Sequence, residues 1–262
     1  RKTMRSQEII ETNEKTYPLN YELEWDNSGL LAGRYQKDVK RIYVALDATD
    51  DVIEAAVRDR ADLLITHHPM LFSPIRRVTD QEFTGRRLLR MIQEDLAYYA
   101  MHTNYDVLRM SELSADYLEL TDQEILDVTC ETPCRQGIGR VAELRSPIKL
   151  KTYCEMVKEA FDLPAVQAFG DLDRPVKRIA VSPGSGKSMI GPALEKGADV
   201  LVTGDIGHHE GIDAVSQGLS IIDAGHYGIE HIFVEDMRRF LAQTFENVTV
   251  TGDVPRQPFS VL

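Results

Sequence analysis

The sequence is poor in cysteine, in histidine and in positive charge. Its three cysteines, Cys130, Cys134 and Cys154, are odd in number and lack C-x-x-C spacing, so we interpret them as reduced thiols rather than as disulfides or zinc ligands. With 30 Lys and Arg against 42 Asp and Glu, the formal net charge is −12, which argues against non-specific binding of a polyanion. We therefore expect no nucleic acid among the partners of this protein.

Long apolar runs are also missing. No uncharged stretch of about 18 residues occurs, so we predict no membrane-spanning helix and no membrane partner. The first residues, RKTMRSQEII, lack the apolar core of a signal peptide. Together with the reduced cysteines, these absences predict a cytoplasmic location. The 262 residues, 43% of them hydrophobic, are enough for one large domain or two small ones.

An internal duplication is the main positive feature of the sequence. Residues 39–69 align with residues 176–206 at a constant offset of 137 without a gap, and eleven of the thirty-one aligned positions are identical. Each copy has an apolar strand pattern, a polar turn, a helix with apolar residues at helical spacing, and a second apolar run, LLIT or VLVT. Strand–helix–strand units of this length form parallel sheets.

The two copies also match one element later. LAYYAMHTNYD and SIIDAGHYGIE each predict a short strand followed by a histidine and, four residues on, by an acid. The pairs are His102 with Asp106 and His226 with Glu230. If a helix begins at each histidine, this spacing places both side chains on one helix face.

The duplication predicts the fold class and the domain organisation. We expect an α/β fold of two duplicated βαβ-containing halves with mostly parallel sheets. The halves are residues 1–135 and 136–262, with a connecting strand and helix at about 137–170. Ligands of open parallel sheets gather beyond the carboxyl ends of the strands, so the residues that follow the strands are the first candidates for a site.

Imidazoles and carboxylates follow these predicted strands. Four of the seven histidines form two adjacent pairs, His67-His68 and His208-His209. An adjacent histidine pair alone is as consistent with a buried structural or solvated pair as with a pair of metal ligands. Taken together, in two halves related by duplication, the motifs predict a metal site. Imidazoles combined with carboxylates suit Zn, Fe(II), Mn or Ni, and carboxylates can bridge two ions.

Gly186-Lys187-Ser188 has the ending of a phosphate-binding G-x-x-x-x-G-K-S loop. The first glycine of that motif would fall on Val181, and Pro183 lies where an amide should face the phosphate. We therefore reject a Walker loop, although the amides of residues 184–186 could still meet an anion.

Six motifs together resemble one known family. In chain order they are Trp25-Asp26-Asn27-Ser28-Gly29-Leu30, ITHHP (65–69), HTNYD (102–106), GIGRVAEL (137–144), TGDIGHHE (203–210) and DAGHYGIE (223–230). Over roughly residues 7–255 the sequence resembles the Nif-three-like dinuclear metal centre proteins, also called GTP cyclohydrolase I type 2 homologues.

The resemblance implies a dinuclear metal centre in a metal cleft between the two halves, and a toroidal homohexamer. It implies two divalent ions per chain, for which Zn, Fe, Mn and Ni are the candidate metals. The metal ligands that it implies are His67, His68, Asp106, His226 and Glu230. Asp106 and Glu230 are the implied bridging carboxylates, and His102 and His208 would line the same region.

Two functions follow as hypotheses. The first is a metal-dependent hydrolase in which activated water attacks a small-molecule substrate such as a nucleotide; the resemblance suggests opening of the imidazole ring of GTP. His102, His208 and Glu210 are the candidate catalytic groups for proton transfer, although a solvated helix start explains His208 and Glu210 equally well. The second is a non-enzymatic, metal-binding regulatory or scaffold hexamer, because a fold and a metal do not define a reaction.

Overall fold

The computed structural model describes residues 3–262 and divides the chain into two compact units. Unit 1 contains the chain up to Tyr105 and the segment Phe233–Pro255, and unit 2 contains Asp106–Ile232 and Arg256–Leu262. The predicted division between residues 135 and 136 does not coincide with these units. The chain enters unit 2 earlier, and it later returns to unit 1 because its last strand completes the unit 1 sheet.

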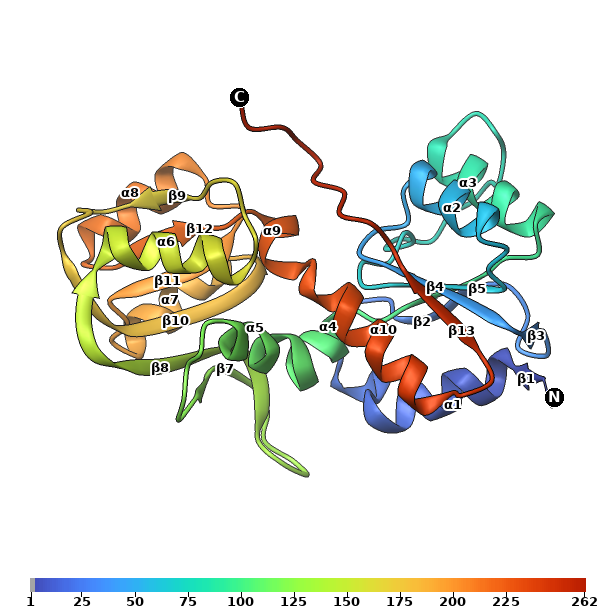
Figure 1. Cartoon of the computed structure of the whole chain (residues 1–262), viewed down its shortest axis with the longest axis horizontal. Helices are drawn as coiled ribbons and strands as arrows, with labels where there is room; N and C mark the ends of the chain where they lie inside the picture. The colour runs from blue at the N-terminus through green and yellow to red at the C-terminus, as the bar shows by residue number, and fades with distance from the viewer. Residues whose placement is uncertain (1–2) are drawn as a thin grey trace. The chain divides into compact units, whose positions relative to one another are not determined.

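Unit 1 is built on a five-stranded sheet of order β13-β4-β5-β6-β2. Four neighbouring strands run parallel, and β2 pairs antiparallel with β6 at one edge. Helices α2 and α3 lie on one face of this sheet, and α1 and α10 lie on the other (Figure 1). The elements are β1 (Met4–Arg5), α1 (Ser6–Thr16), η1 (Leu19–Tyr21), β2 (Gly29–Ala32), β3 (Asp38–Val39), β4 (Arg41–Ala45), α2 (Asp50–Arg58), β5 (Leu63–Thr66), α3 (Phe83–Gln93), β6 (Ala97–Ala100), α4 (Thr103–Tyr105), α10 (Ile232–Thr244) and β13 (Thr249–Gly252).

Unit 2 is built on a six-stranded mixed sheet of order β7-β8-β10-β11-β12-β9. Its three inner strands β10, β11 and β12 run parallel, and the outer strands pair antiparallel. Ala193 of α7 and Ala214 of α8 pack with Leu201 and Ile221 of the sheet in one apolar cluster. The elements are η2 (Asp106–Met110), α5 (Ser111–Tyr117), β7 (Glu124–Cys130), β8 (Gln136–Lys149), α6 (Leu150–Ala160), β9 (Gln167–Phe169), β10 (Pro175–Ser185), η3 (Lys187–Met189), α7 (Ile190–Glu195), β11 (Val200–Gly204), α8 (His208–Ser216), β12 (Ser220–Asp223) and α9 (His226–Glu230).

The two copies of the repeat have their elements at corresponding positions, as the alignment predicts. At the offset of 137, β4 falls within β10, α2 spans the same positions as η3 and α7 together, and β5 starts where β11 starts. Asp62 and Asp199 occupy aligned positions and have the same role. The Oδ2 of Asp62 accepts the amides of Lys40 and Arg41 at 2.7 and 3.1 Å, and that of Asp199 accepts the amides of Lys177 and Arg178, both at 2.8 Å. The repeated aspartate therefore holds the start of the neighbouring strand.

The central parallel strands are buried along their whole length. Every residue of β5, β6 and β11 is buried, as expected where a parallel sheet is covered on both faces. Polar groups are therefore concentrated where these strands end. Among the helices in the described part of the chain, none is long and apolar enough to cross a membrane.

Candidate metal centre

His67 and His68 directly follow β5, the middle strand of the unit 1 sheet. His67 is fully buried, and its Nδ1 lies 2.9 Å from the carbonyl oxygen of Met101. The Nδ1 of His68 lies 2.8 Å from Oδ1 of Asp47, just beyond the end of β4. A carbonyl or a carboxylate oxygen only accepts, so Nδ1 is the donor in both rings. Nε2 is therefore the nitrogen of each ring that can bind a metal ion.

The turn after β5 is held by Tyr98 of the neighbouring strand β6. The Tyr98 hydroxyl lies 2.9 Å from Oγ1 of Thr66 and 3.0 Å from the carbonyl oxygen of His68, and it accepts the amide of Met70 at 2.9 Å. Burial raises the pKa of Tyr98 to about 12, so its hydroxyl stays protonated and keeps its donor. This network fixes the backbone on which the two imidazoles stand.

His102 lies beyond the end of β6 and is held by a buried carboxylate. Its Nδ1 lies 2.9 Å from Oδ1 of Asp26, whose side chain is fully buried. The other oxygen of Asp26 accepts the amide and the hydroxyl of Thr103 at 2.9 and 2.5 Å. Burial alone would raise the pKa of Asp26, but hydrogen bonds from His102 and Thr103 lower it to about 2. Asp26 therefore remains ionised and orients the His102 ring.

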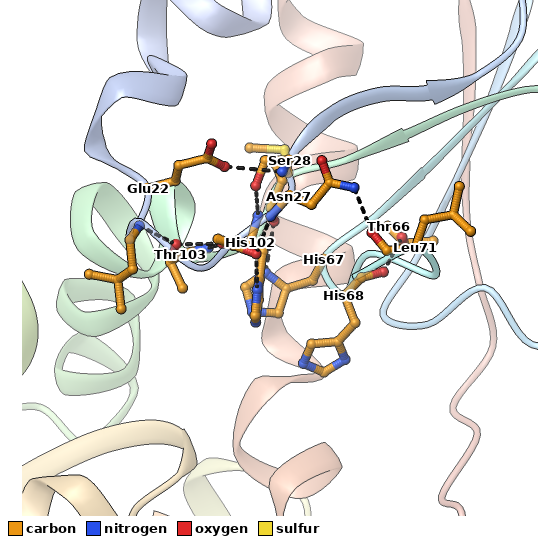
Figure 2. Close-up of polar contacts among 12 residues, drawn as sticks. Glu22, Asn27, Ser28, Thr66, His67, His68, Leu71, His102 and Thr103 are labelled. Carbon is orange, nitrogen blue, oxygen red and sulfur yellow. Dashed lines mark hydrogen bonds and ion pairs between the residues drawn. The ribbon is translucent and has the colours of Figure 1, made fainter. Parts of the chain in front are cut away.

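The three imidazoles of unit 1 form one compact group, the histidine cluster (His67, His68 and His102). One ring nitrogen of each lies within 4.8 Å of those of the others. The ring centroids are separated by 4.9 Å for His67–His68 and by 5.1 Å for His67–His102, and Figure 2 shows the three rings side by side. Each ring is held through Nδ1 by an oxygen, as in metal-binding histidines, whose second nitrogen is fixed by a carboxylate or a carbonyl. The cluster fits a metal ion that prefers imidazole.

Unit 2 holds a second donor group, the carboxylate cluster (Asp106, His226 and Glu230). His226 and Glu230 are the first and last residues of α9, and Nε2 of His226 lies 3.0 Å from Oε2 of Glu230. A carboxylate oxygen of Asp106 lies within 4.8 Å of one of Glu230, which is only 2% exposed. Two carboxylates this close repel each other unless a cation or a proton accompanies them. This pair therefore suits a bound cation.

His226 has a strongly perturbed pKa. Burial alone would lower the pKa of His226, but Glu230 and Asp205 outweigh it and raise the pKa to about 9. Asp205 contributes through its Oδ2, which lies 2.7 Å from Nδ1 of His226. At neutral pH the metal-free imidazole is therefore a cation that compensates the neighbouring carboxylates.

Two glycines allow the backbone to approach the carboxylate cluster. A Cβ on Gly184, whose φ is +82°, would lie 2.6 Å from Oε1 of Glu230, and a Cβ on Gly204 would lie 2.6 Å from the amide nitrogen of His226. The backbone of the glycine-rich stretch before Lys187 therefore packs closely against Glu230.

His208 and Glu210, two of the candidate catalytic residues, lie in the first turn of α8. His208 is exposed and its ring lies edge-on to that of His209, with centroids 5.1 Å apart. Glu210 forms an ion pair of 2.9 Å with Lys187, and the hydrogen bond from Lys187 lowers the pKa of Glu210. Neither residue belongs to a group of three or more metal-capable side chains in the described part of the chain. The third candidate, His102, lies inside the histidine cluster.

Three aspartates that hold these histidines are not among the site residues predicted from the sequence. Asp26, Asp47 and Asp205 each accept from the Nδ1 of a clustered histidine, and each lies in or beside a motif already noted: Asp26 follows Trp25, Asp47 follows β4, and Asp205 directly follows β11. The strand-end argument applied to Asp47 and Asp205 would have identified them. Asp26 lies in a loop outside the repeat, and only the folded chain brings it to His102.

Comparison with known proteins places these features in one family. The sequence profile of the Duf34/NIF3 (NGG1p interacting factor 3) family matches residues 4–255. A Streptococcus pneumoniae protein named GTP cyclohydrolase 1 type 2 homolog is 34% identical over 248 residues, which cover 93% of this chain and 92% of the relative. A Clostridium perfringens protein of the same name is 33% identical over 229 residues, which cover 87% of each chain.

Solved structures show the same architecture. A Bacillus cereus protein related to NIF3 superimposes with a TM-score of 0.95 at 24% identity and covers 100% of both chains, which demonstrates the fold alone. Reduced HcgD from Methanocaldococcus jannaschii superimposes with a TM-score of 0.83 at 29% identity and covers 97% of this chain and 99% of its own.

Proposed function

The chain belongs to the Duf34/NIF3 family, and from this membership we propose that it is a metal-dependent hydrolase acting on a nucleotide or a related small molecule. One observation supports the proposal most directly. All four histidines of the two clusters have Nδ1 against an oxygen acceptor, the arrangement found in histidines that bind a metal through Nε2. In His226 that Nε2 lies 3.0 Å from Oε2 of Glu230, another proposed ligand. His231 differs, because its Nε2 lies 2.7 Å from the carbonyl oxygen of Phe161 and it has a structural role.

We propose that two divalent ions, of Zn, Fe, Mn or Ni, are the cofactors. The residues that would hold them are His67 and His68 in unit 1 and Asp106, His226 and Glu230 in unit 2. When bound, such a pair of ions supplies Lewis-acid activation of water and of the electrophilic atom of the substrate. The donors fit this role, since imidazoles and carboxylates are the groups that these metals prefer.

His102 is the strongest candidate for proton transfer. Ionised Asp26 holds its Nδ1, so Nε2 is the position at which the ring accepts or delivers a proton. The geometry resembles that of other histidine bases, in which a buried carboxylate fixes the tautomer. His208 and Glu210 remain weaker candidates, because the contact that Glu210 makes is an ion pair with Lys187.

Opening of the guanine imidazole ring of GTP is the specific reaction that we propose to test first, since the curated relatives are named GTP cyclohydrolase 1 type 2 homolog. A toroidal homohexamer in the cytoplasm belongs to the same proposal and is supported by the family resemblance. Light scattering tests the assembly, and a stable monomer at micromolar concentration would contradict it without affecting the metal sites.

The experiment combines metal analysis with turnover. The purified chain is loaded with each of the four metals, and nucleotides are screened for metal-dependent hydrolysis. His67→Ala should abolish turnover, whereas His209→Ala, an exposed histidine outside both clusters, should retain it. Metal binding without turnover of any nucleotide would contradict the hydrolase and favour the non-enzymatic regulatory or scaffold protein.

A further inference from the structure

Two large aromatic side chains flank the histidine cluster in unit 1 and are exposed. Trp25 is 61% exposed and Phe72 is 49% exposed. The centroid of each ring lies 5.8 Å from that of His102, at interplanar angles of 73° and 77°. Trp25 precedes β2, and Phe72 lies in the loop between β5 and α3, so two separate segments bring an aromatic ring to the same imidazole.

The backbone beneath these two rings is anchored. The amide side chain of Asn27 donates to the carbonyl oxygen of Leu71 at 2.6 Å, which ties the segment of Trp25 to the segment of Phe72, as Figure 2 shows. The buried carboxylate of Asp26 accepts the amide of Asn27 at 2.8 Å and holds His102 and Thr103 as well. The exposed rings therefore stand on an ordered base, which lowers the entropy lost when they contact a ligand.

The surroundings of the pair favour a flat ring with polar edges. Exposed aromatic faces stack on nucleobase-like rings, because every such ring presents a π face. His102 adds a polar edge: Asp26 holds its Nδ1, and Nε2 can exchange a hydrogen bond with a ring nitrogen or a carbonyl. A plain hydrocarbon ring would leave that polar atom without a counterpart.

We propose that Trp25 and Phe72 form an aromatic subsite that stacks on the heteroaromatic ring of the substrate, with its polar edge toward His102. The proposal deepens the proposed hydrolase and rests on it for the identity of the substrate. It assigns recognition of the ring to two residues that take no part in metal binding.

Trp25 is the one tryptophan in the sequence, so its fluorescence reports directly on this subsite. The full chain is titrated with guanosine, which has the ring but no phosphate, and separately with ribose 5-phosphate. Guanosine should quench the fluorescence saturably, and ribose 5-phosphate should not. Phe72→Ala should weaken guanosine binding by about 5- to 100-fold, the loss expected for one stacking partner.

Matched variants separate stacking from general effects on the surface. Phe83→Ala removes another exposed aromatic of unit 1 and should leave the guanosine titration unchanged. In calorimetry, Trp25→Phe should retain guanosine binding and Trp25→Ala should lose it, while thermal unfolding stays unchanged because the ring is exposed.

Three results would overturn the subsite. The first is that Phe72→Ala binds guanosine as tightly as the parent protein, and the second is that ribose 5-phosphate quenches the fluorescence as strongly as guanosine does. The third is quenching that depends only on protein concentration, which would indicate that a second copy of the chain covers Trp25. A failure of the hydrolase proposal would give a different set of results. Stacking of guanosine without metal-dependent turnover would support the subsite and contradict the catalytic proposal. Turnover without stacking would support the catalytic proposal and contradict the subsite.

Discussion

The two copies of the repeat share a backbone but carry different side chains where the second strand ends. In unit 1 the strand β5 is followed by His67-His68; the aligned positions of unit 2 are Gly204-Asp205. Gly204 lets the backbone pack against His226, and Asp205 holds the Nδ1 of that histidine. Both copies have kept a fully buried apolar strand at this position, and they differ at the residues just beyond it, which contribute to the two clusters.

The histidines that follow the third strand of each copy show the same divergence. His102 and His226 occupy matched positions in the sequence, and each has Nδ1 against an aspartate. Asp26 is buried and comes from outside the repeat, whereas Asp205 is about half exposed and comes from within it. In both copies the imidazole ring is oriented by an aspartate, but the aspartate comes from a different part of the chain.

The largest expected effect comes from removing a proposed ligand in either unit. His68→Ala in unit 1 and Glu230→Ala in unit 2 should each lower the metal content by about one ion per chain or more, because an under-coordinated ion dissociates. Metal analysis by mass spectrometry measures this. His209→Ala and Glu210→Ala are the matched controls and should keep their metal; full retention in the ligand variants would refute the assignment.

Asp47 in unit 1 and Asp205 in unit 2 can be compared as residues that contact a proposed ligand rather than the metal itself. Each holds the Nδ1 of a proposed ligand, and each is about half exposed. Asp47→Asn and Asp205→Asn should weaken metal affinity by roughly 10- to 100-fold in both units, since the ring loses its charged acceptor. Competition with a chelator measures the affinity. Asp51→Asn and Asp213→Asn, on exposed helix positions, should match the parent protein.

The raised pKa of His226 predicts how metal affinity depends on pH. Below its pKa of about 9 the metal-free imidazole holds a proton that the metal must displace, so affinity should rise with pH up to about 9, by no more than about tenfold per unit. Calorimetry in buffers of different ionisation enthalpy should detect proton release at neutral pH. Asp205→Asn should reduce that release, since it removes a charge that raises the pKa of His226 and leaves the proposed ligands in place. Binding without proton release in the parent would contradict this account.

The smallest expected effect concerns the helix ends of the two copies. Arg60 and Gly197 are aligned, and both have a left-handed backbone, with φ of 56° and 66°. A Cβ on Gly197 meets nothing within 4 Å, so Gly197→Ala should destabilise the chain by about 1 kcal/mol through strain alone. Arg60→Gly should change stability in the opposite direction by a smaller amount, since greater freedom of the unfolded chain offsets the relieved strain. Chemical denaturation measures both, and equal effects would contradict the comparison.

Much of the fold could be predicted because the repeat consists of patterns between residues that are close in the sequence. Apolar strands and helical spacing depend on neighbours in the sequence, so the order and register of the βαβ units followed from residues 39–69 and 176–206 alone. The domain boundary did not, because β13 joins the unit 1 sheet by pairing with β4, more than two hundred residues earlier in the chain. No local pattern encodes such a pairing.

The candidate site divides in the same way. Residue types and spacing were sufficient to identify the imidazoles and carboxylates, since each follows a strand and strand ends in a parallel sheet meet at one edge. The state of each group depended on the folded chain: Asp26 reaches His102 across 76 positions, and its burial and its hydrogen bonds together lower its pKa to about 2. The exposure of Trp25 and Phe72 beside the His102 ring could not be predicted from the sequence either. Orientation, burial and pKa are properties of the surroundings of a side chain, and those surroundings exist only once distant segments pack together.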